Sequence, residues 1–154
     1  MKLSIETIAE SRIAYFRSLG EYGGRQNKEA MEELKTWAKR NDLLTNSTIL
    51  GIPQDDPNQT PKEECRYDVC VVIDNDFDVT EPAKLGQFVG GTYAVFLLKH
   101  TSEAVSDFWK RMSTIIEKNE LVVKQQPIIE RYTKGMLEKE LCELLVPIEH
   151  NAAN

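Results

Sequence analysis

Glu130 and Tyr132 are the residues whose types and spacing point most directly to chemistry. They stand two positions apart in the apolar segment 127–132, Pro-Ile-Ile-Glu-Arg-Tyr. Strand residues alternate between faces, so Ile128, Glu130 and Tyr132 would share one face. A carboxylate buried there without a partner carries a large free-energy cost. Either Glu130 points to water from an edge strand, or it lines a pocket whose ligand compensates its charge.

A carboxylate at the base of an aromatic pocket suits two kinds of chemistry. It attracts flat hydrophobic cations, because it supplies the opposite charge and each ring adds cation–π attraction of about 0.5–2 kcal/mol. Alternatively, Glu130 acts as a general base on water while Tyr132 donates a hydrogen bond. No nucleophile with an adjacent base and a third orienting group is evident, so covalent catalysis has no support.

Three further aromatic residues are candidate ligand contacts. Trp109 belongs to a helical stripe that explains it fully as helix-to-sheet core, which favours that role over ligand contact. Tyr22 lies either at a cavity rim or in a solvated loop. Phe16 and Tyr15 point to opposite faces of one strand, so at most one faces a cleft, and the sequence does not say which. The expected ligand-binding set is Glu130, Tyr132, Trp109, Tyr22 and Phe16.

The remaining polar residues favour structural roles, and no cofactor or metal is expected. The three cysteines form no CxxC pair and read as reduced, packed thiols: Cys65, Cys70 and Cys142. Asp55 and Asp56, just before a proline, favour a turn over a metal site. Arg66 and Asp68 are two apart on one strand face, which favours a structural ion pair.

Composition excludes several classes of function. The formal net charge of −6 opposes direct nucleic-acid binding and suits neutral or cationic partners. No apolar run approaches the roughly 20 residues that span a bilayer, and the N-terminus lacks the apolar region of a secretory signal. We therefore expect a cytoplasmic protein with no membrane partner.

Hydrophobic patterning predicts the order strand, helix, strand, strand in the first half of the chain. The strands are expected around residues 13–16, 47–52 and 65–73, and the helix from Asn27, a plausible N-cap, to about 40. Asn41 is able to adopt a left-handed conformation after the helix.

The second half predicts the same order. Strands are expected at 92–98, 127–132 and 140–148, with a helix that begins at a cap, Thr101 or Ser102, and ends near 118. Residues 79 and 88–89 are expected at most to extend neighbouring strands.

Local sequence similarity relates the two halves. Residues 39–43 match 117–121 at an offset of 78, residues 14–16 match 94–96 at 80, and residues 70–73 match 145–148 at 75. At an offset of 79, the counterpart of Glu130 is Gly51. These repeats predict an α+β fold of duplicated strand-helix-strand-strand units, whose antiparallel sheets pack together with a ligand cleft between the halves.

One domain is expected to span residues 1–154. Its pseudo-repeats cover about 4–73 and 92–148, a connecting segment covers about 74–91, and 149–154 form a frayed tail that includes His150.

Three stretches resemble one known family. They are residues 13–23, a strand leading to Gly-Glu-Tyr-Gly; residues 51–70, with Asp-Asp-Pro and then Arg-Tyr-Asp; and residues 127–148, with the segment that holds Glu130 and Tyr132. In order and spacing they resemble the GyrI-like (gyrase-inhibitor-like) small-molecule-binding family, which includes the effector-binding domains of AraC-type and MerR-type multidrug regulators. One departure is Glu21, which stands where the family has proline.

The resemblance implies that Glu130 faces a drug-sized cavity. It also implies a link to transcription regulation, and because the module begins near Met1 we expect the stand-alone form, with any effect on transcription indirect. The leading hypothesis is a protein that senses or sequesters hydrophobic, cationic small molecules.

Two other functions stay open from the resemblance. One is a hydrolase of strained, cyclopropane-type electrophiles that uses Glu130 and Tyr132. The other is a protein-interaction role such as modulation of DNA gyrase, for which the sequence carries no signature of its own.

Overall fold

The computed structural model describes residues 2–45 and 47–149, so the part of the expected tail from 150 to 154 lies outside the described residues. Its elements are, in chain order, β1 (Lys2–Ile8), β2 (Ser11–Leu19), α1 (Arg25–Arg40), β3 (Ile49–Pro53), η1 (Lys62–Glu64), β4 (Arg66–Ile73), β5 (Lys84–Phe88), β6 (Gly91–Lys99), α2 (Ser102–Lys118), β7 (Ile129–Tyr132), α3 (Lys134–Glu138) and β8 (Leu141–Pro147).

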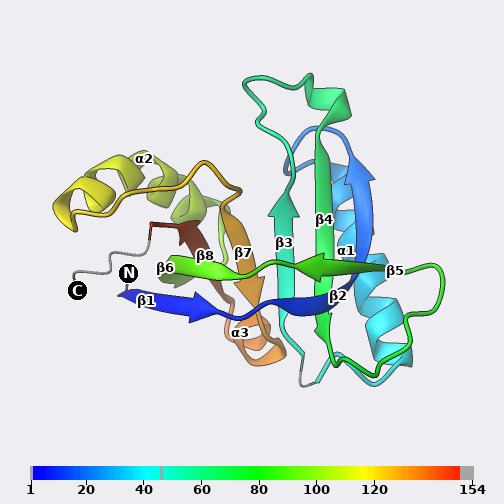
Figure 1. The fold of residues 1–154 in the computed structure, drawn as a ribbon. Coiled ribbons are helices and arrows are strands. Elements are labelled where there is room, and N and C mark those ends of the chain that lie inside the picture. The colour runs from blue at the N-terminus through cyan, green and yellow to red at the C-terminus, as the bar shows by residue number, and fades with distance from the viewer. Residues whose placement is uncertain (1, 46, 150–154) are drawn as a thin grey trace.

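Within the described ranges, the strands form one eight-stranded sheet with the order β1-β6-β8-β7-β3-β4-β2-β5 (Figure 1). All its ladders are antiparallel, which confirms the α+β class with duplicated units. The expected packing of two separate sheets is wrong, because the halves join edge to edge through β3 and β7. This pairing gives hydrogen-bond partners to the backbone N–H and C=O groups of β3 and β7, which would be unpaired if each strand were the edge of a separate sheet.

The register of the sheet follows the sequence repeat. Gly51 on β3 lies directly opposite its repeat counterpart Glu130 on β7, so this pair marks the pseudo-two-fold axis between the halves. The row of residues that runs across the sheet through this pair is also symmetric. On either side of the pair, Val69 corresponds to Leu144 at the repeat offset of 75, and Phe16 corresponds to Phe96 at the repeat offset of 80. In order across six strands the row reads Phe16, Val69, Gly51, Glu130, Leu144 and Phe96.

Two strands were not assigned from the sequence, and they exchange between the halves. The first, β1, pairs with β6 of the second half, and β5 pairs with β2 of the first half. The consecutive strands β1 and β2, and likewise β5 and β6, therefore each run from one half of the molecule to the other, and the two pairs lie side by side (Figure 1). Gly90 lies at the crossing with a φ of 77°, and an added Cβ would overlap the carbonyl oxygen of Ile8.

The two long helices end alike, as the repeat predicts. Asn41 and Asn119 cap them, and each donates its side-chain N–H to the carbonyl oxygen four residues earlier, at 2.8 and 2.7 Å. The left-handed position falls one residue later than expected, on Asp42 and Glu120, with φ of 56° and 53°.

The helix starts differ from each other. Thr101 caps α2 by accepting from the Ala104 N–H, so of the two expected caps it is Thr101. The expected N-cap Asn27 is wrong, because α1 begins at Arg25 after Gly24. The Asn27 side chain instead accepts from the Gly23 N–H and donates to the Ser18 hydroxyl.

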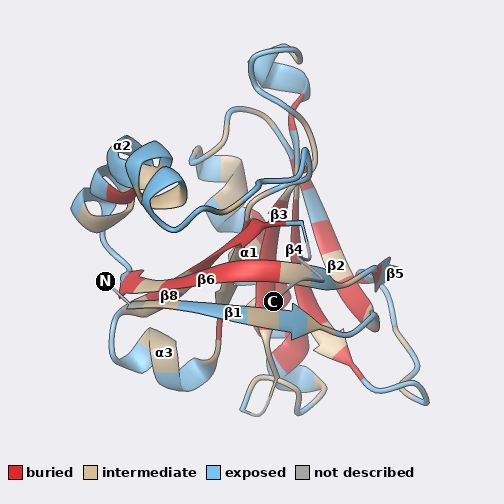
Figure 2. Cartoon of the chain, turned by 60° about the vertical axis from the view of Figure 1, so that its left-hand side comes forward, coloured by how far each residue is buried: buried red, intermediate tan, exposed pale blue. Residues whose placement is uncertain are grey.

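The helices differ in how closely they pack on the sheet. From α1, Ala30, Leu34, Trp37 and Ala38 are buried, whereas from α2 only Phe108 is buried among the described residues. Most of α2 is accordingly exposed in Figure 2, while the central strands are buried.

The opposite face of the sheet holds a second apolar cluster, which includes Leu50, Cys70 and Leu145. The three cysteines are free and buried, which confirms the expected reduced thiols. None of the helices in the described ranges combines the length and apolar character that a bilayer crossing requires.

Candidate ligand-binding site

Glu130 lies on the helix-bearing face of the sheet, between Gly51 on β3 and Leu144 on β8. Its side chain is partly buried at the junction of the two halves. Burial raises the pKa of the Glu130 carboxyl above its ordinary value, and the nearby His100 opposes that shift. Burial therefore makes the charged form of this carboxyl more costly than it is in water.

Tyr132 shares this face, as strand alternation predicts, and connects the site to α1. It is only 4% exposed, and its hydroxyl donates to the Met31 sulfur at 3.5 Å. The imidazole of His100, just after β6, stacks on the Tyr132 ring with centroids 5.7 Å apart. Burial raises the pKa of Tyr132, and the charge of Glu130 adds to the shift.

Tyr67 on β4 is a site residue that the sequence reasoning missed. Its side chain leans across β3 toward the Gly51 position, because a Cβ added at Gly51 would overlap the Tyr67 hydroxyl and lie 3.6 Å from the Glu130 Cβ. Burial raises the pKa of Tyr67, and the charge of Glu130 raises it further. The available signal was Gly51 itself, since glycine inside a strand often marks the close approach of another group.

Tyr22 contacts this group through Tyr67, with ring centroids 6.1 Å apart. Its hydroxyl donates to the carbonyl oxygens of Asp55 and Arg66, and accepts from the Asp55 N–H at 3.0 Å. The expected choice between a cavity rim and a solvated loop was incomplete, because the hydroxyl is bound to backbone.

Phe16 lies away from this group. Phe16 shares the face of Glu130, but it is 7% exposed and packs edge-on against Trp37 under α1. In the sheet, β3 and β4 lie between β2, which carries Phe16, and β7, which carries Glu130. Three strand spacings of about 4.8 Å therefore place the two residues about 14 Å apart. Trp109 is 46% exposed on α2, so the reading of it as helix-to-sheet core is wrong.

The expected ion pair between Arg66 and Asp68 is not formed, because each has a different partner. Arg66 binds the Asp55 carboxylate with two guanidinium contacts of 3.0 Å, which also accounts for Asp55 in the turn. Asp68 is buried and accepts from Arg17 at 2.7 and 2.8 Å, and from Gln54 at 3.0 Å.

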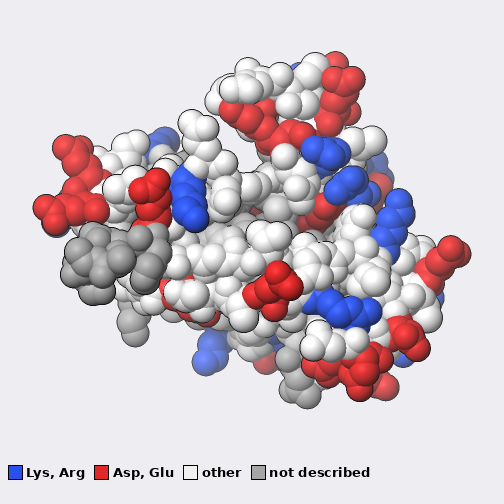
Figure 3. Space-filling model, viewed as in Figure 1, with Lys and Arg blue, Asp and Glu red and all other residues white. Residues whose placement is uncertain are grey.

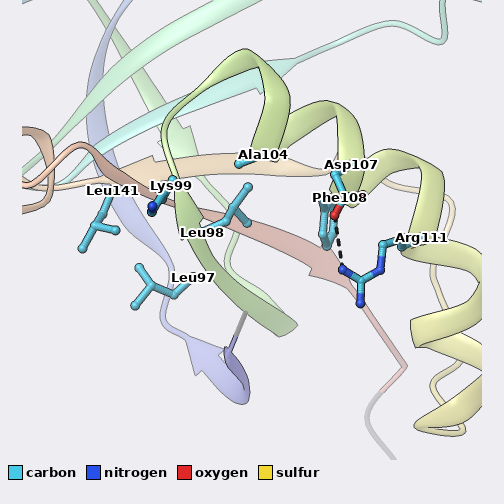
Figure 4. Close-up of a pocket in the computed structure, with 8 residues that line it drawn as sticks. All are labelled: Leu97, Leu98, Lys99, Ala104, Asp107, Phe108, Arg111 and Leu141. Carbon is cyan, nitrogen blue, oxygen red and sulfur yellow. Dashed lines mark hydrogen bonds and ion pairs between the residues drawn. The ribbon is translucent and has the colours of Figure 1, made fainter.

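Two hollows among the described residues are lined by other side chains. One of about 490 Å³ lies between α2 and the end of β6, with Leu98 and Phe108 in its lining and Arg111 paired to Asp107 beside it (Figure 4). The other, of about 360 Å³, lies beside α1 near Trp37. Neither of them is lined by Glu130.

On the face shown in Figure 3, acidic side chains gather on the loop before β4, at the top of the view. The exposed acidic residues of this loop include Asp56, Glu63 and Glu64. Within residues 2–45 and 47–149, no group of three or more His, Cys, Asp or Glu side chains is arranged to hold a metal ion.

The arrangement combines one partly buried carboxylate with aromatic rings from separate strands. The sequence model of the GyrI-like small molecule binding domain matches residues 1–149. The chain belongs to this family.

Two kinds of relative add to this assignment to the GyrI-like family. A Bacillus subtilis (strain 168) protein, named "SPbeta prophage-derived putative transcriptional regulator YosT", is 61% identical over 149 residues, which are 97% of this chain and 100% of YosT.

Solved structures share the GyrI-like fold. SAV2435 bound to tetraphenylphosphonium has a TM-score of 0.63 at 20% identity, with 97% of this chain and 94% of that chain covered. The EcmrR C-terminal domain has a TM-score of 0.71 at 9% identity, with 97% and 98% covered. At these identities the matches show a common fold, and the ligand in the first is a property of SAV2435.

Proposed function

We propose that this protein binds lipophilic aromatic cations at Glu130 and thereby senses or sequesters them. The observation that carries the proposal is the position of Glu130, a partly buried carboxylate at the junction of the two halves. Tyr67 and Tyr132 lie close enough that its charge raises the pKa of both phenols. Burial makes an uncompensated charge costly there, so a cation that enters relieves the cost.

Aromatic neighbours favour the same class of ligand. Tyr132 and the imidazole of His100 stack on each other beside the site, and tyrosine rings attract cations through their faces. The binding of tetraphenylphosphonium by SAV2435, which has the same fold, supports this choice of ligand class. One charge and apolar walls impose few directional contacts, so we expect broad specificity.

Calorimetric titration of wild type and Glu130→Gln with tetraphenylphosphonium tests the proposal. We expect the substitution to weaken binding about tenfold or more, which corresponds to about 1.4 kcal/mol. The matched control is Glu138→Gln, the same change at an exposed position on α3, which should bind like wild type.

A neutral aromatic probe separates charge from shape. Triphenylphosphine oxide should bind wild type and Glu130→Gln with similar affinity, because it offers no cation to the carboxylate. Equal affinity of both proteins for tetraphenylphosphonium would refute a role for the Glu130 charge.

Hydrolysis of a strained electrophile is the less favoured use of the same carboxylate. In that chemistry Tyr132 would supply a hydrogen bond, but its hydroxyl already donates to Met31. We expect wild type to leave a cyclopropane-type electrophile unconsumed relative to buffer, as measured by chromatography.

A further inference from the structure

The space above Gly51, next to the base of the Glu130 side chain, is filled by the phenol of Tyr67. A methyl group added at Gly51 would overlap the Tyr67 hydroxyl, lie 3.0 Å from the ring carbon that bears it, and stand 3.6 Å from the Glu130 Cβ. One small group at Gly51 would therefore touch both side chains. The end of the Tyr67 ring and the base of the Glu130 side chain share this space across the axis between the halves.

Tyr67 is supported from behind. The Tyr22 ring packs against it, tilted by 57°. Three hydrogen bonds fix the Tyr22 hydroxyl to the backbone of Asp55 and Arg66, and the ion pair between those two side chains closes the same loop. Tyr22 thus acts through Tyr67 and positions it.

The phenol also resembles part of a ligand in its chemistry. It is an aromatic ring placed next to the carboxylate, and burial together with the Glu130 charge keeps its hydroxyl protonated. The two hollows described above are lined by residues other than Gly51, Tyr67 and Glu130.

We propose that Tyr67 is an internal plug in the Glu130 site, and that a ligand enters by displacing its ring from above Gly51 with an aryl group of its own. This inference rests on the proposed function and narrows the ligand class to cations that carry an aryl group close to the charge, as benzylic ammonium and arylphosphonium ions do. Gly51 is the specificity-determining partner of Tyr67, because only glycine leaves room for the ring.

A double-mutant cycle tests the contact itself. Gly51→Ala should lower the urea midpoint in the wild-type background, where the new methyl meets the phenol. In a Tyr67→Ala background it should have little effect, since the next nearest atom, the Glu130 Cβ, is at an ordinary contact distance of 3.6 Å. Equal loss in both backgrounds would overturn the assignment of Gly51 as the space for Tyr67.

Binding experiments test the plug. Para-cresol, which is the tyrosine side chain as a free molecule, should raise the melting temperature of Tyr67→Ala and leave wild type unchanged. Benzyltrimethylammonium should bind Tyr67→Ala at least tenfold more tightly than wild type. Tyr67→Phe keeps the ring, so it serves as the matched control and should bind both probes like wild type.

The results distinguish failure of the plug from failure of the proposed function. If Tyr67→Ala gains no affinity for either probe, the plug is refuted. If it gains para-cresol binding but binds benzyltrimethylammonium equally with and without Glu130→Gln, the plug stands and the cation proposal fails. Should Tyr67→Ala be unfolded, Tyr67→Leu, which is too short to cover Gly51, must show the same gain in cation affinity for the plug to stand.

Discussion

At the scale of single residues, Glu130 combines a stability cost with a binding role. Burial raises its carboxyl pKa, with His100 opposing the shift, so the folded protein holds this proton more tightly than the unfolded chain does. The folded state then loses stability as pH rises from the unfolded value through the raised folded value. Tyr67, Tyr132, His100 and Cys142 are the titratable groups close enough to couple to it.

Glu130→Gln should therefore be more stable than wild type at pH 7, because the amide resembles the neutral carboxyl. The difference should shrink toward pH 4, where the wild-type carboxyl also becomes protonated. Urea denaturation at both pH values measures this. A variant less stable than wild type at pH 7 would show that the native site compensates the charge already.

The sequence revealed Glu130 but not its principal neighbour. A charge inside an apolar strand is visible in one segment, and alternation correctly places Tyr132 on the same face. Tyr67 could be identified only from the register between β3 and β4, because that register places its ring over Gly51, 16 positions earlier in the sequence. Such a diagonal contact depends on strand pairing, and no local pattern encodes it.

At the scale of elements, the crossing ribbons hold the two halves together. They meet where Gly90 packs on the backbone of Ala9 and Glu10, with an added Cβ 2.9 Å from each of two backbone atoms. The residue also has a positive φ of 77°. Backbone cannot move aside as a flexible side chain does.

Gly90→Ala should destabilise the fold by about 3 kcal/mol, the combined cost of overpacking and of a left-handed alanine. Gly135→Ala on α3 is the matched control, since its nearest neighbour would be 3.9 Å away and alanine favours helices by about 1 kcal/mol. Thermal denaturation of both variants measures the contrast. Equal stability would mean that the crossing tolerates a side chain.

The repeat predicted the elements within each half but not the exchange between halves. Helix ends and the strand row from Phe16 to Phe96 follow the sequence offsets. By contrast, β1 and β5 are edge strands whose partners lie in the other half, so short apolar patterns gave no signal for their pairing.

At the scale of the whole molecule, duplication accounts for the place of the site. Equivalent strands β3 and β7 meet at the pseudo-two-fold axis, and there the repeat is broken: one half supplies Gly51 and the other Glu130. The glycine makes room for an aromatic ring beside the carboxylate. A symmetric scaffold thus carries one asymmetric pair at its centre.

A crystal structure with bound tetraphenylphosphonium would show whether the cation binds at Glu130. We expect the phosphonium on the helix-bearing face between the halves, beside the Glu130 carboxylate, with the Tyr67 ring moved away from Gly51. A cation bound instead in the hollow between α2 and β6, with Tyr67 still over Gly51, would contradict this expectation.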